Sequence, residues 1–369
     1  MKKKKILVLG QTPPPYGGQA LMLQTLLEGQ YEHAELFHVR LDFSKDFNDM
    51  GSFKLYKLWA LIKAILLTWT YRFRYNIDIF YYGPAGPNKM AMLRDVILLA
   101  PTRFLFKKTI IHTHAGGSSR LYDGLSPLLK FFYRAAFFKP SVLITLTDYS
   151  HGDDIVLQPE KLFVVPNGIK DEYPLYEKHC APSADGLTTF LYVGAMYEER
   201  GTGILIEAAR ILKQKGYNFR INLVGIFISA EYKAQLTNFV KEYKLENEVS
   251  FLGTRINEAK WKEYCNADVF CFPTYVPSET FGIVLVEAMQ FRMPVIASRW
   301  NGIPFVVDEN ENALLTEPQN TQDTVEKMEL LINDHHLRQQ LGENGRKKFL
   351  EKYSIETFLK NMDKVFAEV

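Results

Sequence analysis

The stretch VFCFPTYVPSETFGIVLVEAMQFRMPVIAS, residues 269–298, contains one complete strand–helix–strand unit. Two short apolar runs, Val269–Pro273 and Pro294–Ala297, have the length and composition of buried strands. Between them, Phe281–Phe291 has the length and composition of a helix. Continuous apolar strands that alternate with helices are typical of parallel sheets covered on both faces. This stretch therefore predicts an α/β fold.

The same alternation continues through most of the chain. It predicts further strands at Ile6–Gly10, Ile77–Tyr82, Thr109–Thr113, Val142–Thr147, Leu162–Val165, Thr189–Gly194, Arg220–Val224 and Val249–Leu252. It predicts helices between them at Gln19–Leu27, Phe53–Arg74, Gly203–Gln214, Ala230–Tyr243 and Glu258–Cys265, and a helical tail from Thr321 onward. Ligands of such sheets bind at the carboxyl ends of the strands.

The pattern breaks once, around 167–186, and a chain of 369 residues is too long for one ordinary core. We therefore expect two doubly wound, Rossmann-like domains that face each other across a cleft. The first is residues 1–170, joined by a C-terminal helix, 354–369, that crosses back to it. The second is residues 171–353.

Composition places the chain among globular proteins, with 47% hydrophobic and 23% charged residues. Its three cysteines are an odd number without paired spacing, which excludes a disulfide scaffold or a zinc cluster and suggests a reducing compartment. The apolar run Ile6–Leu9 is too short for a signal peptide. The longest apolar stretch, Leu58–Tyr71, is shorter than the roughly 20 residues of a membrane-spanning helix. We expect a cytoplasmic protein.

Charge is unevenly distributed along the chain. Residues 1–176 contain 22 Lys and Arg against 15 Asp and Glu, whereas residues 177–369 contain 22 against 27. Two segments of the first half, Phe53–Arg74 and Leu128–Lys139, interleave aromatic residues with cations. They are either core helices with cationic rims or helices that lie in the headgroup layer of an anionic membrane, on the inner face of the cytoplasmic membrane. Nucleic acid is not an expected partner, because no recognised motif accompanies the basic residues.

Two carboxylates frame the start of the helix in the opening stretch. The N–H groups of Phe281, Gly282 and Ile283 lack helical partners and form a site suited to a phosphate, which the glycine lets approach closely. Glu287 lies about 1.5 turns further on, where it can accept both hydroxyls of a ribose. Glu279 precedes the helix and points toward the group beyond the phosphates. Taken alone, Glu279 is better explained as a charge at a helix N-terminus and Glu287 as part of a solvated helix face. The two carboxylates together, eight positions apart around Thr-Phe-Gly, favour the binding site.

Three further segments follow predicted strands. Gly17 and Gly18 open a helix and allow a phosphate or sugar to approach, or they form a plain turn. His114 ends a strand, where it can orient a hydroxyl or share a proton, or serve as a structural histidine. Arg200, in the segment 194–201 (GAMYEERG), can cover a diphosphate or be a surface cation. His112 should lie in the core on the opposite face.

Asp153 and Asp154 follow Ser150 near a helix start, and we interpret both as capping residues. They belong to no pattern of metal ligands. The chain contains no Asp-x-Asp motif and no histidine cluster with metal-ligand spacing. We expect no metal and no other cofactor.

At the Glu279-x7-Glu287 pattern the sequence resembles glycosyltransferase family 4, the retaining nucleotide-sugar transferases of the GT-B fold. The resemblance extends in order over nearly the whole chain. It includes PPPYGG at 13–18, HTHAGG at 112–117, VPNGI at 165–169, MPVIAS at 293–298, NGIP at 301–304 and NALLTEP at 312–318.

The resemblance implies a role for each candidate residue. Glu279 would contact the hydroxyls of the transferred sugar and Glu287 the ribose. Arg200 would hold the diphosphate, although Ala195 stands where the family commonly has a second cation. His114 would lie beside the donor sugar and the acceptor.

The segment that contains Arg255 and Ile256 would border the nucleotide base, chiefly through its backbone. Family members typically work without a metal.

The resulting expectation is a retaining, metal-independent glycosyltransferase. It would move a sugar from a nucleoside-diphosphate sugar to a lipid-linked saccharide or other surface-glycan precursor. Two alternatives stay open. One is a related nucleotide-sugar epimerase or phosphorylase. The other is a non-catalytic, nucleotide-binding partner of a glycan assembly complex.

Overall fold

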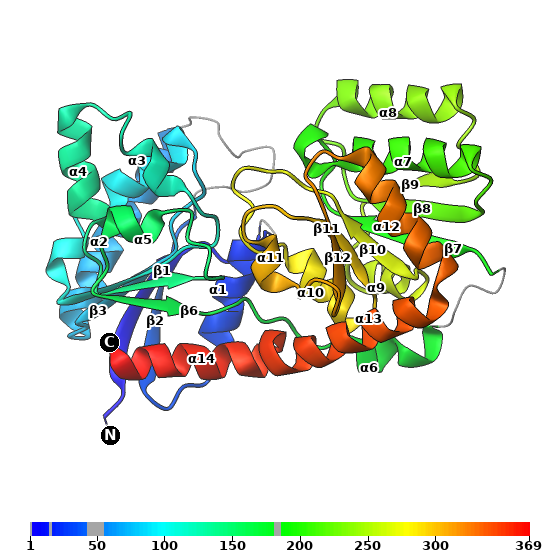
Figure 1. Ribbon diagram of the computed structural model, residues 1–369. Helices are drawn as coiled ribbons and strands as arrows, with labels where there is room; N and C mark the ends of the chain where they lie inside the picture. Colours follow the sequence, from blue (N-terminus) through cyan, green and yellow to red (C-terminus); the bar gives the residue numbers. More distant parts are fainter. Residues whose placement is uncertain (1, 15–16, 43–54, 181–185) are drawn as a thin grey trace. The chain divides into compact units, whose positions relative to one another are not determined.

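The structure is a computed structural model that describes residues 2–14, 17–42, 55–180 and 186–369. The chain divides into two compact units (Figure 1). Unit 1 is Met1–Gly168 with Ile355–Val369, and unit 2 is Ile169–Ser354. In the described residues each unit contains one six-stranded parallel sheet with helices, so the predicted α/β class is confirmed.

The sheet of unit 1 has the strand order β2-β1-β3-β4-β5-β6. Its strands are β1 (Lys4–Gly10), β2 (Ala34–Arg40), β3 (Ile79–Tyr82), β4 (Lys108–His112), β5 (Val142–Thr145) and β6 (Lys161–Val164). Its helices are α1 (Gly18–Glu28), α2 (Leu55–Arg74), α3 (Lys89–Leu99), α4 (Pro127–Phe137), α5 (Asp153–Leu157) and α14 (Ile355–Glu368). The apolar strands form the core, where Leu7, Phe80, Ile111 and Leu143 are fully buried.

Helix α14 joins unit 1 from the far end of the sequence and packs beside β2 (Figure 1). Lys4 Nζ donates to the carbonyl of Ala367 at 2.7 Å, and His33 Nδ1 contacts Asp363 Oδ2 at 2.8 Å. The Phe366 ring meets Tyr31 edge to face. The last helix is therefore an integral part of the first unit.

The sheet of unit 2 has the strand order β12-β11-β10-β7-β8-β9. Its strands are β7 (Thr188–Val193), β8 (Phe219–Val224), β9 (Val249–Gly253), β10 (Val269–Phe272), β11 (Val295–Ser298) and β12 (Ala313–Thr316). Its helices are α6 (Tyr173–Tyr176), α7 (Thr202–Gln214), α8 (Ala230–Glu242), α9 (Asn257–Cys265), α10 (Ile283–Gln290), α11 (Ile303–Val306), α12 (Thr321–Asn333) and α13 (His335–Lys348). Helix α7 packs against α8 and α12, and α10 packs against α13.

Two strands of the structure, β2 and β12, are not predicted from the sequence. Strand β2 has the sequence AELFHVR and lies at the edge of its sheet, so its polar residues are tolerated and its apolar run is broken. Strand β12 is also an edge strand and has only four residues. The part of the expected helix Phe53–Arg74 before Leu55 lies outside the described residues.

The structure contradicts the expectation that the cysteines are unpaired. Cys180 and Cys265, 85 positions apart, form a disulfide with a Cα–Cα distance of 4.3 Å. The segment that contains α6 packs against α9, and this contact brings the two thiols together although their sequence spacing gives no hint of it. Cys271 is buried and free. The reducing compartment inferred from unpaired cysteines loses that support.

None of the helices in the described residues combines the length and the apolar character needed to cross a membrane.

Candidate functional site

Glu279 lies in the loop 273–282, which follows the carboxyl end of β10 in unit 2. Its Oε2 accepts a hydrogen bond from Arg200 Nη1 at 2.6 Å, and its Oε1 accepts one from the backbone N–H of Gly282 at 3.1 Å. Arg200 comes from the connection between β7 and α7. The structure therefore brings together three residues that the sequence singled out.

The connection before α7 supports the Glu279 loop on one side. The Glu199 carbonyl accepts from the backbone N–H of Tyr275 at 2.8 Å and from Thr274 Oγ1 at 3.3 Å. Gly201 has a φ of 73°, and a Cβ built on it would lie 2.1 Å from the Pro273 carbonyl oxygen. Only glycine adopts this positive φ without strain and also leaves room for the Pro273 carbonyl. The close approach of the two backbones at Gly201 keeps the neighbouring Arg200 next to the loop.

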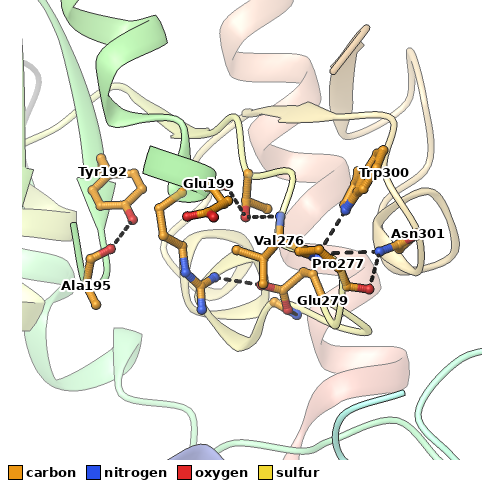
Figure 2. A network of polar contacts seen from close by, with 11 residues as sticks. Tyr192, Ala195, Glu199, Val276, Pro277, Glu279, Trp300 and Asn301 are labelled. Atoms are coloured by element: carbon orange, nitrogen blue, oxygen red, sulfur yellow. Dashed lines mark hydrogen bonds and ion pairs between the residues drawn. The ribbon is translucent and has the colours of Figure 1, made fainter. Parts of the chain in front are cut away.

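The segment after β11 supports the loop on the other side (Figure 2). Trp300 Nε1 donates to the Val276 carbonyl at 2.8 Å, and Asn301 Nδ2 donates to the Pro277 carbonyl at 3.0 Å. A Cβ on Gly302 would lie 1.8 Å from the Thr280 carbonyl oxygen. Strands β7, β10 and β11 are neighbours, so the site stands where the ends of three adjacent parallel strands meet.

Arg200 carries its charge in a partly desolvated place. Burial lowers its pKa, but the neighbouring Glu279 carboxylate and the Tyr197 hydroxyl raise it, and the net pKa lies above the usual value. Its guanidinium stands over the rings of Tyr197 and Phe272. Among the described residues its buried Nε has no hydrogen-bond partner. The Arg200 guanidinium is held by Glu279 through Nη1, and its other nitrogens can donate hydrogen bonds to an anion.

The start of α10 differs from the prediction. The helix begins at Ile283 rather than at Phe281, after Gly282 in the left-handed region with a φ of 68°. The Phe281 side chain is buried and meets Tyr353 edge to face. The Gly282 N–H is already bonded to Glu279, so it is not one of the open donors that the sequence predicted. The positive end of the helix dipole nevertheless lies beside Glu279 and Arg200.

Glu287 is buried, with 8% of its surface exposed, which excludes the solvated-face interpretation. Its Oε1 accepts from Lys260 Nζ at 2.7 Å and its Oε2 from the Tyr264 hydroxyl at 2.9 Å. Burial, and then the carboxylate of Glu287, raise the pKa of Tyr264 well above its usual range. The two partners lie four residues apart on one face of α9, but no sequence pattern linked that face to Glu287.

The two residues predicted beside the base lie in the connection from β9 to α9. Ile256 is 69% exposed, and Arg255 pairs loosely with Glu263 at 3.6 Å. Helix α9, which starts at the next residue, also carries Lys260. Ala195, the position where the resemblance implies a second cation, accepts a hydrogen bond on its carbonyl from the Tyr192 hydroxyl at 2.8 Å (Figure 2).

The predicted residues of unit 1 meet around one cavity. Gly17, Gly18 and His114 all line it, and its volume is about 560 Å³. Gly17 has a φ of −135°, which any residue can adopt, and a Cβ added at either glycine would meet nothing within 4 Å. A side chain at either position would therefore not collide with neighbouring atoms. At Gly17 the backbone conformation does not require glycine either. The two residues keep the start of α1 open toward the cavity.

The two histidines at the end of β4 form a stacked pair, with ring centroids 4.2 Å apart. His112 is fully buried, as expected, and its Nδ1 contacts the Tyr81 hydroxyl at 2.5 Å. The two rings do not lie on opposite faces, which corrects the prediction. Burial lowers the pKa of His114 to about 4, against a smaller opposing effect of its hydrogen bond with Asn167. His114 is therefore neutral at pH 7 and can orient a hydroxyl without carrying charge.

Asp153 has a different role from the predicted cap. It lies in the first turn of α5 and is fully buried, but its carboxylate accepts the backbone N–H groups of Gly117 and Ser119, each at 3.0 Å. It thereby fixes the loop that follows His114. Asp154 instead bonds the Ser150 hydroxyl. Nothing in the sequence pattern links Asp153 to that loop, since 36 positions separate it from Gly117.

Within the residues that the structure describes, one group of possible metal ligands arises from the fold rather than from sequence spacing. Ligand atoms of Glu32, His33 and Asp363 lie within 4.8 Å of one another in unit 1. His33 and Asp363 already satisfy each other through two hydrogen bonds. We interpret this group as the attachment of α14.

Comparisons with known proteins show a likeness to one family of enzymes. Residues 180–348 match the family model described as glycosyl transferases group 1. The uncharacterized glycosyltransferase MJ1178 of Methanocaldococcus jannaschii is 32% identical over 65% of this chain and 63% of that protein. The capsular polysaccharide biosynthesis glycosyltransferase CapM of Staphylococcus aureus is 29% identical over 47% of this chain and 44% of CapM. The chain thus spans less than two thirds of the length of these curated relatives.

A solved structure extends the likeness to the fold. The Anabaena protein Alr3699/HepE, crystallised in complex with UDP, superposes with a TM-score of 0.73 at 19% identity over 99% of this chain and 100% of that chain. Residues 180–348 are thus similar to the group 1 glycosyltransferases, and the chain has the GT-B fold expected from its sequence. The narrower assignment to family 4 stays a prediction.

Proposed function

We propose that this protein is a retaining glycosyltransferase that moves a sugar from a nucleoside-diphosphate sugar to a lipid-linked or surface-glycan precursor. The observation that carries the proposal is the arrangement in unit 2. Glu279 is fixed by Arg200 and Gly282 at the start of α10, and Glu287 is buried further along the same helix. A helix N-terminus, a cation and two carboxylates suit a diphosphate flanked by a ribose and a sugar.

Each side chain has a proposed role. Glu287 accepts hydrogen bonds from the ribose hydroxyls, for which it exchanges part of its present bonding to Lys260 and Tyr264. Arg200 and the α10 dipole hold the diphosphate and stabilise the charge that develops as it leaves, so that no metal is required. Glu279 contacts the hydroxyls of the transferred sugar, and neutral His114 orients a hydroxyl.

The reaction breaks the bond between the anomeric carbon and the diphosphate oxygen and forms one to the acceptor oxygen. We propose that the acceptor attacks from the leaving-group side and that its proton passes to the departing diphosphate. The anomeric configuration is then retained. Exclusion of water would make transfer faster than hydrolysis.

The relatives support the donor and the acceptor class. HepE, whose fold this chain shares, was crystallised in complex with UDP, and CapM is named for capsular polysaccharide biosynthesis. We therefore propose a nucleoside diphosphate as the donor's leaving group and a growing surface polysaccharide as the product.

The surface of unit 1 supports a peripheral membrane location. Residues 55–139 contain 13 Lys and Arg but only three Asp and Glu. Large apolar side chains on α2 and α4 lie exposed among these cations, including Trp59 at 72%, Phe73 at 68% and Phe131 at 67%. Such a surface suits the headgroup layer of an anionic membrane, such as the inner face of the cytoplasmic membrane.

The direct test is a transfer assay with a panel of nucleotide sugars and short-chain lipid-phosphate saccharides. The proposal expects release of a nucleoside diphosphate that depends on the acceptor, and a product whose anomeric proton coupling matches the donor. Donor isomerisation without acceptor would indicate an epimerase, and turnover that requires inorganic phosphate would indicate a phosphorylase. Nucleotide binding without turnover on any acceptor would indicate the non-catalytic partner.

A further inference from the structure

The cavity of unit 1 combines two kinds of wall. One part is formed by residues at the carboxyl ends of β1, β3 and β4 and at the start of α1, including Gly17, Gly18 and His114. The other part is formed by apolar side chains of α2 and α3, such as Leu58, Leu61, Leu93 and Ile97. Its volume of about 560 Å³ is that of a small-molecule site.

The apolar wall is continuous with the outer surface. Leu58, Leu93 and Ile97 line the cavity and are also 45%, 36% and 44% exposed. The neighbouring exposed residue Met90, at 57%, lines it as well. The cavity therefore connects the apolar, cationic face of unit 1 to the strand ends beside His114.

The charges of the wall favour an anion. Among the described residues that line the cavity there are two cations, Lys57 and Arg94, and no carboxylate. Arg94 is paired with the buried Asp95 at 2.6 Å, and the Tyr82 hydroxyl bonds the same carboxylate at 2.7 Å. Lys57 is buried, with 3% of its surface exposed, and lines the cavity from α2.

We propose that this cavity binds the lipid part of the acceptor, namely an alkyl or isoprenoid chain attached to a phosphate. The chain would enter between α2 and α3, the phosphate would lie near Lys57, and the attached saccharide would extend toward Gly17 and His114. This inference rests on the proposed function, because it assigns the acceptor side of that reaction. It requires neither a particular sugar nor a particular nucleotide.

The test uses the full chain and isothermal calorimetry with n-alkyl phosphates of increasing length, kept below their critical micelle concentrations. We expect saturable binding of one molecule per chain. Each added methylene should tighten binding about fourfold until the cavity is filled, after which affinity should stop rising. Affinity that keeps rising with chain length, without saturation, would mean partition onto the exposed face and would overturn the proposal.

Two matched tryptophan variants locate the binding site. Ala91 lines the cavity from α3, and Ala91→Trp should fill part of it and weaken alkyl phosphate binding at least tenfold. Ala135 is exposed on α4 and does not line the cavity, so Ala135→Trp should bind like the wild type. Equal binding by both variants would contradict the proposal.

A second pair covers the case in which Ala91→Trp fails to fold. Leu93→Asp places a carboxylate on an exposed residue of the cavity wall, whereas Leu128→Asp places it on an exposed residue of α4 away from the cavity. Only Leu93→Asp should weaken binding. Lys57→Met should weaken binding of dodecyl phosphate more than of dodecanol, and an equal effect on both would remove the phosphate from the proposal.

The same calorimeter separates this inference from the proposed function. The cavity variants lie in unit 1 and should leave nucleoside-diphosphate binding unchanged. Alkyl phosphate binding without any nucleotide binding would overturn the proposed function and leave the lipid site standing. Nucleotide binding together with no alkyl phosphate binding would overturn the lipid site alone.

Discussion

Arg200 and Glu279, 79 positions apart in the sequence, form an ion pair of 2.6 Å at the ends of two neighbouring strands. The carboxylate also holds the Gly282 N–H at the start of α10. The Glu279 side chain thus holds in place both the Arg200 guanidinium and the start of α10, which the proposed reaction uses.

Glu279→Gln should lower kcat by roughly 100-fold or more, because the amide can neither pair with Arg200 nor stabilise developing positive charge on the sugar. Nucleoside-diphosphate affinity should change much less. The measurement is steady-state kinetics beside calorimetry. Glu199→Gln is the matched control, since Glu199 is exposed and supports the loop through its backbone carbonyl. Unchanged kcat in Glu279→Gln would refute the assignment.

Glu287→Gln should weaken nucleoside-diphosphate binding about 10- to 100-fold, the size expected for losing hydrogen bonds to a charged group. Glu287→Ala should in addition destabilise the fold, because it removes the partner of Lys260 and of Tyr264 on α9. The expected loss is about 1–3 kcal/mol for the buried Tyr264 hydroxyl left unsatisfied. Thermal unfolding distinguishes the two variants. Wild-type affinity in Glu287→Gln would remove Glu287 from the donor site.

His114 should make stability depend on pH. Its pKa is about 4 in the fold, below the ordinary value of 6.5, so between these values the unfolded chain binds a proton that the folded chain does not. Stability should therefore fall as the pH drops from 6.5 toward 4. His114→Gln should reduce that slope by up to about 1.4 kcal/mol per pH unit. Urea titrations at several pH values measure it, and an unchanged slope would contradict the assigned burial.

Gly302→Ala should damage the site through the backbone, because its Cβ would lie 1.8 Å from the Thr280 carbonyl oxygen and must displace the Glu279 loop. We expect a lower melting temperature and weaker nucleotide binding. Gly17→Ala is the matched control for stability, since its Cβ would meet nothing within 4 Å. Equal melting temperatures for the two variants would show that the loop does not depend on this contact.

The cationic face of unit 1 should bind anionic vesicles. Each cation near an anionic leaflet contributes about 1 kcal/mol, so Lys63→Glu with Arg134→Glu should weaken binding roughly 30-fold or more. Lys233→Glu with Lys241→Glu, on α8 of unit 2, is the matched control. Vesicle sedimentation at low salt is the measurement. No binding by the wild-type protein would overturn the peripheral membrane location.

Local sequence patterns predict those features that depend on local structure. Continuous apolar runs indicate most of the strands, and the spacing of Glu279 and Glu287 around a helix start indicates the candidate site. The edge strand Ala34–Arg40 is not predicted, because polar residues break its apolar run. Helix α10 begins two residues later than the pattern indicates, at Ile283 instead of Phe281, because the left-handed conformation of Gly282 ends the loop there.

Contacts between distant segments cannot be predicted in the same way. Lys260 and Tyr264 bond Glu287 across 27 and 23 positions, and Asp153 reaches Gly117 across 36. The disulfide joins cysteines 85 positions apart. Each contact depends on the order of strands in a sheet, which sets the neighbours of every connecting loop and helix. A single sequence shows residue types and spacing but not that order.

The most direct test of the central claim is calorimetric binding of UDP, GDP, ADP, CMP and dTDP, each with and without magnesium, to the wild type and to Glu287→Gln. The account predicts that, without magnesium, the wild type binds one nucleoside diphosphate with much higher affinity than the other nucleotides. Glu287→Gln should bind that nucleotide at least tenfold more weakly. Binding of none of them, or equal binding by both proteins, would contradict a donor site built on Glu287.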